Sequence, residues 1–273
     1  MNIPSGLLPN QRALAVAALL MAVGASACSQ ADADLSRAYR TIAGKKFVDL
    51  THSFGPETPV WAGFGQAKFS PTADPRTHQP YTIAKDGFHG TTYEMVGQYG
   101  THVDPPAHFA EGGLTLDQIP LEQMILPLIV LDDTPHLTRE PNHAFSAEDL
   151  NAWERQHGRV PAKSFVALRT DMYKDWDTNP ERFKRSPFPG WALETIKVLY
   201  EQRGVTATGH EPLDADTSAR MDSETYILQH GHYQIEAMAN LDQVPATGAL
   251  IVVTWPKVRG GLGFPARAFA IVP

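Results

Sequence analysis

The sequence predicts a single α/β domain. A continuous apolar run occupies residues 125–131, as expected for a strand covered on both faces. Residues 249–255 form an apolar, β-branched run that predicts a central strand, and residues 165–170 predict another strand. Helical patterns occupy residues 146–156 and 191–203 between these strands. The chain has 273 residues, of which 42% are hydrophobic, so it can bury a large core and fits a globular enzyme domain.

The elements before the first apolar run are shorter. Residues 45–50 predict the strand that opens the domain. Residues 62–90 are rich in Gly, Pro, Thr and His and predict a loop with one short strand, and residues 91–96 lead from it into the next strand. Residues 121–132 predict a helical turn followed by a buried strand.

Capping residues mark the ends of the two helices. Ser146 is placed to cap the first helix with Asp149 at its third position, and Gly158 ends it. Gly204 is the expected C-cap of the second helix. The aromatic residues of the loop at 171–189 can either bind a planar substrate or close a small core of their own.

Net charge restricts the partners. The formal charge of −7 argues against a nucleic acid partner, because such proteins present a basic surface to phosphate groups. We therefore expect a small-molecule substrate and no nucleic acid.

The N-terminal residues predict export. Residues 1–27 have the pattern of a signal peptide: a positive charge at Arg12, an apolar segment at 13–23 and an Ala-Ser-Ala cleavage pattern. Cys28 follows at once and is either an ordinary free cysteine or the lipidated residue of a bacterial lipoprotein. As the only cysteine it forms no disulfide within the chain. We expect a periplasmic protein, membrane-anchored if Cys28 is lipidated, with residues 28–44 as a tether that ends in a short polar helix.

The stretch Q-Y-G-T-H-V-D-P-P-A-H-F carries the chemistry. In a strand, Gln98, His102 and Asp104 share one face, and an extended chain adds His108 to it. Gly100 falls in the same register and leaves a gap where an ion could sit. Imidazole, carboxylate and amide oxygen suit Zn²⁺ or Mn²⁺, and His108 is near enough to move a proton. The alternative is a polar strand face satisfied by hydrogen bonds.

This stretch resembles the signature H-x-G-T-H-x-D-x-P-x-H-F of the cyclase family of metal-dependent hydrolases, which includes arylformamidases and isatin hydrolases. Gln98 stands where the family has its first His. The resemblance implies that Gln98, His102 and Asp104 bind metal and that His108 is the proton carrier. The matching residues are Gly100, Thr101, His102, Asp104, Pro106, His108 and Phe109.

Two later segments extend the resemblance. Glu236 corresponds to the family's distal metal-binding carboxylate, and Glu224, twelve positions earlier, stands where the family has His. The resemblance implies Glu236, and with this substitution Glu224, as further ligands of Zn or Mn. The substitutions leave open a single ion, Mn²⁺ in place of Zn²⁺, or a lost second site. Asp214 and Asp216 fall near polar positions of the family and are also typical turn residues.

Four residues are candidates for the substrate pocket. The family's opening strand and loop, which help to wall the active site, correspond here to a segment with His52 and Trp61, although Trp61 could equally pack in the core. His210 ends a predicted strand and could reach the site. Arg267, in a Pro-x-Arg match, is either an anion clamp or, as we favour, a structural ion-pair partner.

The resemblance covers residues 45–273 and implies a mixed, partly barrel-like sheet flanked by helices, of the swivelling β/β/α type, in a homodimer or homotetramer. It implies metal-dependent, arylformamidase-like hydrolysis of an amide or cyclic amide C–N bond in a small aromatic substrate. Metal-bound water would be the nucleophile and His108 the proton carrier. The alternatives are an exported small-ligand-binding protein, an inactive relative with a degraded metal site, or lactone hydrolysis or dehydration at the same site.

Overall fold

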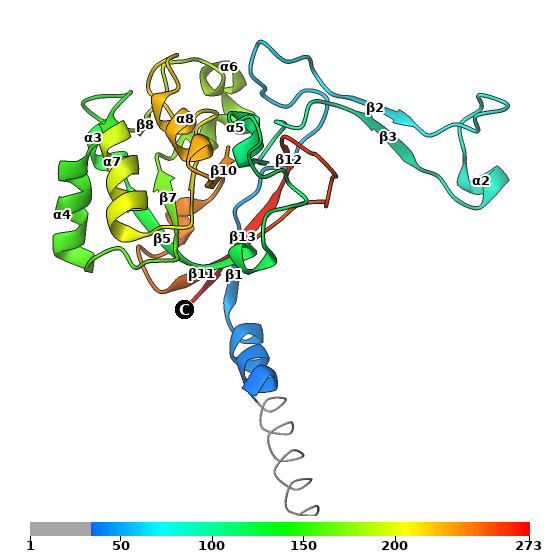
Figure 1. The fold of residues 1–273 in the computed structure, drawn as a ribbon. Helices are drawn as coiled ribbons and strands as arrows, with labels where there is room; N and C mark the ends of the chain where they lie inside the picture. The colour runs from blue at the N-terminus through cyan, green and yellow to red at the C-terminus, as the bar shows by residue number, and fades with distance from the viewer. Residues whose placement is uncertain (1–33) are drawn as a thin grey trace, which may run out of the picture. The chain divides into compact units, whose positions relative to one another are not determined.

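The computed structural model describes residues 34–273 (Figure 1). The predicted signal peptide and Cys28 lie outside the described residues. The chain separates into two units at residues 46 and 47, and residues 34–43 form a helix in the first unit. Within the described part, no helix is long and apolar enough to cross a membrane.

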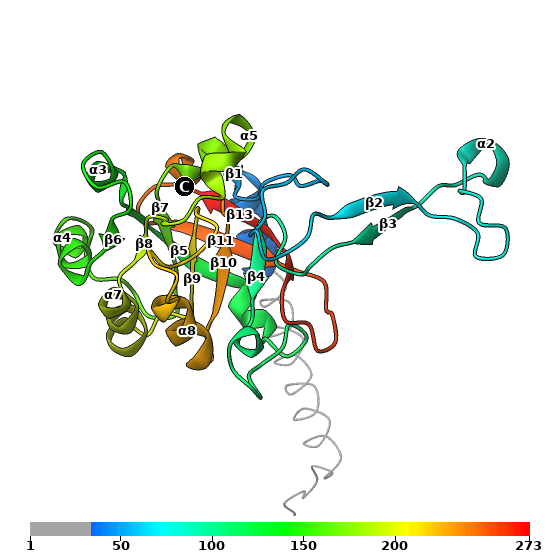
Figure 2. The same cartoon turned by 90° about the horizontal axis from the view of Figure 1, so that it is seen from above.

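One mixed sheet of nine strands forms the body of the second unit. Its order is β1-β13-β11-β5-β7-β9-β10-β4-β12. The strands from β5 to β10 run parallel, and the pairs β13–β11, β11–β5, β10–β4 and β4–β12 are antiparallel. The sheet curls into a half-barrel, as Figure 2 shows from above, so the predicted mixed, partly barrel-like sheet is confirmed. The strands are β1 (Lys46–Asp49), β4 (His102–Asp104), β5 (Ile125–Asp132), β7 (Phe165–Arg169), β9 (Ala207–His210), β10 (Tyr233–Glu236), β11 (Ala249–Thr254), β12 (Phe264–Pro265) and β13 (Arg267–Val272).

The two faces of the sheet bury different cores. Along β7, Phe165 and Ala167 belong to the core inside the half-barrel, whereas Val166 and Leu168 belong to the core beneath the helices. This alternation follows from the twofold period of a strand. Helices α4 and α7 cover the outer face, where Leu150 packs with these strand residues (Figures 1 and 2). The helices are α3 (Thr134–Leu137), α4 (Ala147–His157), α7 (Leu193–Lys197) and α8 (Asp222–Gln229), with a π-helical turn at Val198–Arg203 after α7.

Most predicted elements are confirmed, and the differences concern their ends. Ser146 and Asp149 form a reciprocal capping box on α4, and Gly204 adopts a left-handed conformation after the π-helical turn. The second helix begins later than expected because Trp191 belongs to the two-residue strand β8 (Gly190–Trp191), which pairs with β6 (Ala144–Phe145).

The predicted loop at 171–189 is in fact largely helical. It contains three short helices, and its aromatic residues mostly pack together in a small core. These helices are η3 (Met172–Lys174), α5 (Asp175–Thr178) and α6 (Pro180–Phe183).

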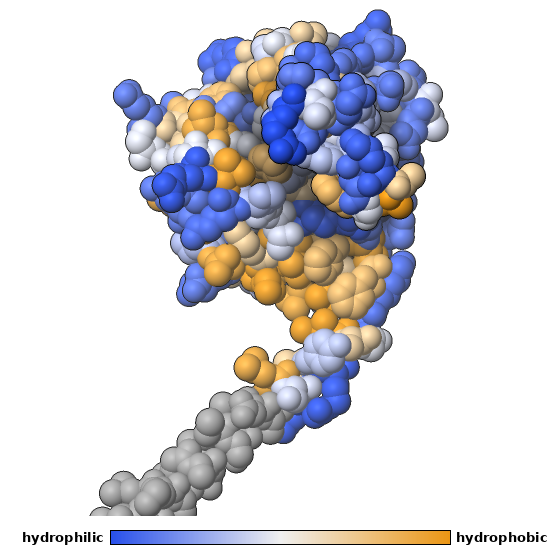
Figure 3. All heavy atoms as spheres, turned by 90° about the vertical axis from the view of Figure 1, so that its right-hand side faces the viewer, coloured by the Kyte–Doolittle hydropathy of each residue, from blue (hydrophilic) through white to orange (hydrophobic). Residues whose placement is uncertain are grey.

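A two-stranded ribbon projects from the body and carries α2 (Ile83–Asp86) at its tip (Figures 1 and 2). It consists of the predicted short strand, β2 (Lys68–Pro71), paired with β3 (Thr91–Glu94). Phe88 and Tyr93 of this arm are more than half exposed. Figure 3 views the molecule from the side of the arm and shows hydrophilic residues above and apolar residues gathered below.

Candidate metal centre and active site

Two antiparallel strands bring the central residues together. His102 and Asp104 alternate on β4, and Glu236 of β10 lies directly opposite His102 in the register. Residues two apart on one strand, and residues paired across strands, share a face of the sheet. His102, Asp104 and Glu236 therefore converge on one buried spot, and each side chain is almost fully enclosed.

The imidazole of His102 faces two carboxylates. Its Nδ1 lies 2.9 Å from the carbonyl oxygen of Gly100, which can only accept, so Nδ1 carries the proton. Its Nε2 lies 3.5 Å from Asp104 Oδ2 and 3.4 Å from Glu236 Oε2, and it has no hydrogen-bond partner. Burial alone would lower the pKa of His102, but Asp104 and Glu236 outweigh it and raise this pKa well above its usual value. The site therefore calls for a positive charge at Nε2, either a proton or a metal ion.

These residues fit a divalent ion. Bonds of about 2.0–2.2 Å to a tetrahedral ion separate neighbouring ligand atoms by roughly 3.4 Å. The separations of 3.4 and 3.5 Å from His102 Nε2 match that spacing. An imidazole with two carboxylates is a donor set for Zn²⁺ or Mn²⁺.

Further carboxylates surround the centre. Glu224, in the first turn of α8, is buried, and burial followed by the charges of Glu236 and Asp104 raises its pKa well above the usual value. Burial and Glu236 likewise raise the pKa of Asp214 to about 7. Like charges held this close oppose one another's ionisation, so a bound cation would stabilise the ionised form of all these carboxylates.

Asp216 has a different role. Its carboxylate accepts the backbone N–H groups of Ser223 and Glu224 at 2.9 Å each and so caps the start of α8. It is a capping residue, as one of the two predicted interpretations had it.

Gln98 lies beside the centre, before the strand. Its Nε2 donates to the carbonyl of Leu262 at 2.7 Å and to Asp104 Oδ1 at 3.3 Å, so it orients the Asp104 carboxylate. To bind a metal, Gln98 would have to turn its Oε1 toward Asp104 and His102. Its role as a ligand stays a prediction. Two predictions about this stretch are wrong: that the strand already includes Gln98, and that Gly100 leaves a gap for an ion. The left-handed conformation of Gly100, at φ 65°, delays the strand until His102, and a side-chain atom of Phe54 lies only 3.1 Å from where a Cβ on Gly100 would be. No gap for an ion exists at that position.

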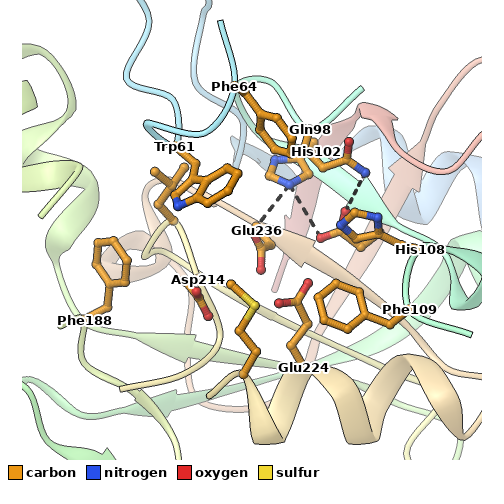
Figure 4. A pocket seen from close by; sticks show the side chains of 13 residues that line it. Trp61, Phe64, Gln98, His102, His108, Phe109, Phe188, Asp214, Glu224 and Glu236 are labelled. Atoms are coloured by element: carbon orange, nitrogen blue, oxygen red, sulfur yellow. Dashed lines mark hydrogen bonds and ion pairs between the residues drawn. The ribbon is translucent and has the colours of Figure 1, made fainter. Parts of the chain in front are cut away.

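His108 lies at the end of a 3₁₀ turn, η1 (Pro106–His108), which follows the paired prolines. It lines the cavity above the buried centre, next to Phe109 (Figure 4). Burial opposes ionisation of Asp104, but His102 and then His108 lower the pKa of this carboxyl. His108 is thus close enough to the centre to act on a group bound there.

The cavity has a polar floor and apolar walls. It encloses about 230 Å³, and its floor is the carboxylate and imidazole group. Trp61, a predicted pocket residue, is half exposed and lines this cavity, where it meets Phe64 edge to face with ring centroids 5.0 Å apart. Figure 4 shows the aromatic rings on either side of the space above Glu236. The apolar wall residues are Trp61, Phe64, Phe109, Phe188, Leu213 and Met221.

The other predicted pocket residues do not line this cavity. His52 stacks on Trp176 with ring centroids 4.1 Å apart and does not line this cavity. Arg267 forms an ion pair with Asp49 at 2.7 Å, which is the structural role we favoured, rather than clamping an anion. His210 is fully buried, and its Nε2 lies 3.4 Å from Glu236 Oε1. It therefore reaches the centre, as predicted, but does not line the cavity.

One functional residue escaped the sequence analysis. Gln234 is fully buried and donates from Nε2 to Glu236 Oε1 at 2.9 Å, and it lies 3.5 Å from Asp104 Oδ2. It therefore holds two of the three candidate ligands in place. Its position two residues before Glu236 on the same strand is the signal that could have revealed it.

The fold and this buried centre beneath an aromatic cavity define a metal-dependent hydrolase. The sequence model of the Cyclase family matches residues 48–217, and the chain belongs to that family. An isatin hydrolase from Roseibium aggregatum is 29% identical over 246 residues, which cover 83% of this chain and 91% of that protein. A kynurenine formamidase from Erythrobacter litoralis is 26% identical over 203 residues, or 74% of this chain and 82% of that protein.

Solved structures agree with the fold. Isatin hydrolase A from Labrenzia aggregata, bound to benzyl benzoate, superposes with a TM-score of 0.78 at 26% identity and covers 88% of this chain and 99% of its own. Isatin hydrolase A from Ralstonia solanacearum superposes with a TM-score of 0.75 at 27% identity, covering 90% of this chain and 97% of its own.

Proposed function

We propose that the protein hydrolyses an amide or cyclic amide C–N bond in a small aromatic substrate. The observation that carries the proposal is the convergence of His102, Asp104 and Glu236 on the floor of a cavity walled by aromatic rings. The similarity to isatin hydrolases and kynurenine formamidases supports this reaction class.

His102, Asp104 and Glu236 are the residues that would hold the ion, Zn²⁺ or Mn²⁺, with Glu224 beside them. When bound, such an ion polarises a carbonyl oxygen and lowers the pKa of water. Gln98 and Gln234 hold Asp104 and Glu236 through their side-chain amides, which keeps both carboxylates turned toward His102. Such supporting hydrogen bonds fix the orientation of ligands.

His108 is the proton carrier in this proposal. Its side chain lines the cavity, and no hydrogen bond to it is formed by another side chain within residues 34–273. An imidazole that is free on this side can take the proton from the attacking water and then give it to the leaving nitrogen. The C–O bond to water forms and the C–N bond then breaks, which gives a carboxylic acid and an amine; a cyclic amide gives both groups on one ring-opened product.

The aromatic walls select the substrate. Trp61, Phe109 and Phe188 line the cavity on different sides of the space above Glu236 (Figure 4). Flat rings pack well between aromatic side chains, so a planar substrate can be held with its carbonyl toward the polar floor. An aliphatic amide of the same reactivity lacks these contacts and should bind more weakly.

A substrate panel tests the proposal. Purified protein is stripped with a chelator, reconstituted with Zn²⁺ or Mn²⁺, and assayed with an N-formyl arylamine, an aryl-fused cyclic amide, an aliphatic formamide and an aryl lactone. We expect metal-dependent hydrolysis of the two aryl amides and slower turnover of the aliphatic one. Turnover of the lactone alone, with metal bound, would show that the reaction class is wrong.

A further inference from the structure

A second group of histidines and carboxylates lies away from this cavity. It consists of Asp133, His136, His143 and Asp149, here called the peripheral cluster. Asp133 follows β5, His136 belongs to α3, and Asp149 lies in the first turn of α4. None of the four lines the cavity above Glu236, and Figure 1 shows α3 and α4 on the opposite side of the body from β12.

Asp133 orients both imidazoles. Its Oδ1 lies 3.0 Å from His136 Nδ1 and 2.7 Å from His143 Nδ1, and its side chain is fully buried. Because an ionised carboxylate can only accept, both Nδ1 atoms carry their protons. The ring centroids lie 4.5 Å apart with 31° between the ring planes. Since both Nδ1 atoms face Asp133, both Nε2 atoms point away from it.

Both Nε2 atoms face a second carboxylate. His136 Nε2 lies 3.4 Å from Asp149 Oδ1, and His143 Nε2 lies 3.5 Å from Asp149 Oδ2. The backbone N–H and the hydroxyl of Ser146 donate to Asp149 Oδ2 at 2.8 and 2.6 Å, and these hydrogen bonds fix the Asp149 carboxylate. Both Nε2 atoms therefore face one carboxylate, an arrangement that calls for a positive charge between them, either a proton or a metal ion.

The arrangement matches a metal site with its supporting carboxylate. Histidines that bind metal usually donate their other ring N–H to a carboxylate or carbonyl, as His136 and His143 do toward Asp133. The separations of 3.4 and 3.5 Å equal the ligand spacing expected around a tetrahedral ion. Asp133, His136 and His143 are also grouped closely enough that one donor atom of each lies within 4.8 Å of the others, so Asp133 is the alternative carboxylate ligand.

We propose that His136, His143 and Asp149 bind one divalent ion of the Zn²⁺ class, with Asp133 holding both rings. The ion would join the end of β5, the α3 turn and the first turn of α4, so its role is structural. Solvent reaches the site, because the His136 side chain is 41% exposed and lines a surface cavity together with Asp149.

The test separates the two centres by removing one at a time. In the His102→Ala/Asp104→Ala background, untagged protein is stripped with a chelator, dialysed against micromolar Zn²⁺ and analysed for metal. We expect about one Zn per chain in this background and its loss when His136→Gln and His143→Gln are added. His157→Gln is the matched control, since His157 lies on α4 and lines the same surface cavity but does not belong to the cluster.

Two results would overturn the proposal. In one, the His102→Ala/Asp104→Ala background takes up no Zn; in the other, adding His136→Gln and His143→Gln leaves its Zn content unchanged. Circular dichroism verifies folding. Because His136 is partly exposed, the single His136→Gln variant of the otherwise unchanged protein gives a second measurement. It should bind one Zn fewer than wild type, lose the rise in Tm on Zn addition that the peripheral cluster provides, and keep its hydrolytic rate. Loss of Zn in Asp133→Asn but not in Asp149→Asn would overturn the assignment of Asp149 as a ligand.

Discussion

The proposed catalytic centre, formed by His102, Asp104 and Glu236, and the peripheral cluster pose the same electrostatic problem in different surroundings. In each, a hydrogen bond at Nδ1 fixes the imidazole, and Nε2 faces carboxylate oxygens at 3.4–3.5 Å. The catalytic centre is held between the paired strands β4 and β10 beneath an aromatic cavity. The peripheral cluster lies on a four-residue helix and a helix start. Metal-binding geometry alone therefore does not distinguish a catalytic site from a structural one.

What surrounds each centre makes the difference. Above His102 there is space for a substrate, and His108 lies beside that space with its ring free to accept a proton. In the peripheral cluster both imidazoles are already tied to Asp133, and no third histidine belongs to the group. A catalytic metal centre needs an open position and a proton carrier, whereas a structural one needs only ligands.

The largest predicted effect follows from removing the carboxylate at the catalytic centre. Asp104→Ala should abolish metal binding there and lower kcat/KM for the aryl amide about 10³-fold or more, because a bound ion supplies several kcal/mol to the transition state. Asp133→Asn is the matched change in the peripheral cluster and should leave kcat/KM within about twofold. Metal content and initial rates are measured on both variants. Equal losses of activity would show that the two clusters do not differ in their role in the reaction.

The sequence predicted residues that the structure brings together at the candidate centre, because part of their signal is local. His102, Asp104 and His108 lie within seven residues, and a strand of period two followed by a proline stop places them near one another. Glu236 lies 134 positions beyond His102, and only the resemblance to a family connected it to that stretch. Strand register, which sets Glu236 opposite His102, depends on the whole sheet and cannot be calculated from either segment alone.

The sequence failed where side-chain packing decides the result. Gly100 appeared to leave room for an ion, but Phe54, distant in sequence, fills that space. His52 appeared to face the pocket, but its ring stacks on Trp176, which comes from the loop whose fold was not predicted. The peripheral cluster escaped notice for a similar reason, since α3 and α4 have no periodic signal that brings His136 to Asp149.

The second prediction concerns the proton carrier. His108→Ala should retain metal at the catalytic centre but lower kcat by about 10²–10⁴-fold, the usual contribution of a general acid and base. KM should change little, because the aromatic walls remain. The comparison is His143→Gln, which removes a proposed ligand of the peripheral cluster and should leave kcat unchanged. A His108→Ala enzyme with the wild-type rate would mean that another group moves the proton.

The third and smallest predicted effect concerns a histidine that faces no carboxylate. Burial against Trp176 is the main cause that lowers the pKa of His52 from 6.5 to about 4. The folded protein therefore holds His52 neutral while the unfolded chain takes up a proton below about pH 6.5, so stability falls as the pH falls from there toward 4. Lowering the pH from 7.5 to 6 should therefore reduce the free energy of unfolding by about 1 kcal/mol through this one group.

The His52→Gln variant isolates that effect. Its absolute stability will be lower because the ring stacking is lost, but the decrease in its free energy of unfolding from pH 7.5 to 6 should be smaller than that of wild type. Denaturant unfolding in the presence of a chelator measures the difference without a contribution from metal binding at either cluster. Equal pH dependence in the two proteins would show that the environment of His52 does not disfavour its charge. In that case, burial without a nearby carboxylate would not set His52 apart from the histidines of the two clusters, which face carboxylates.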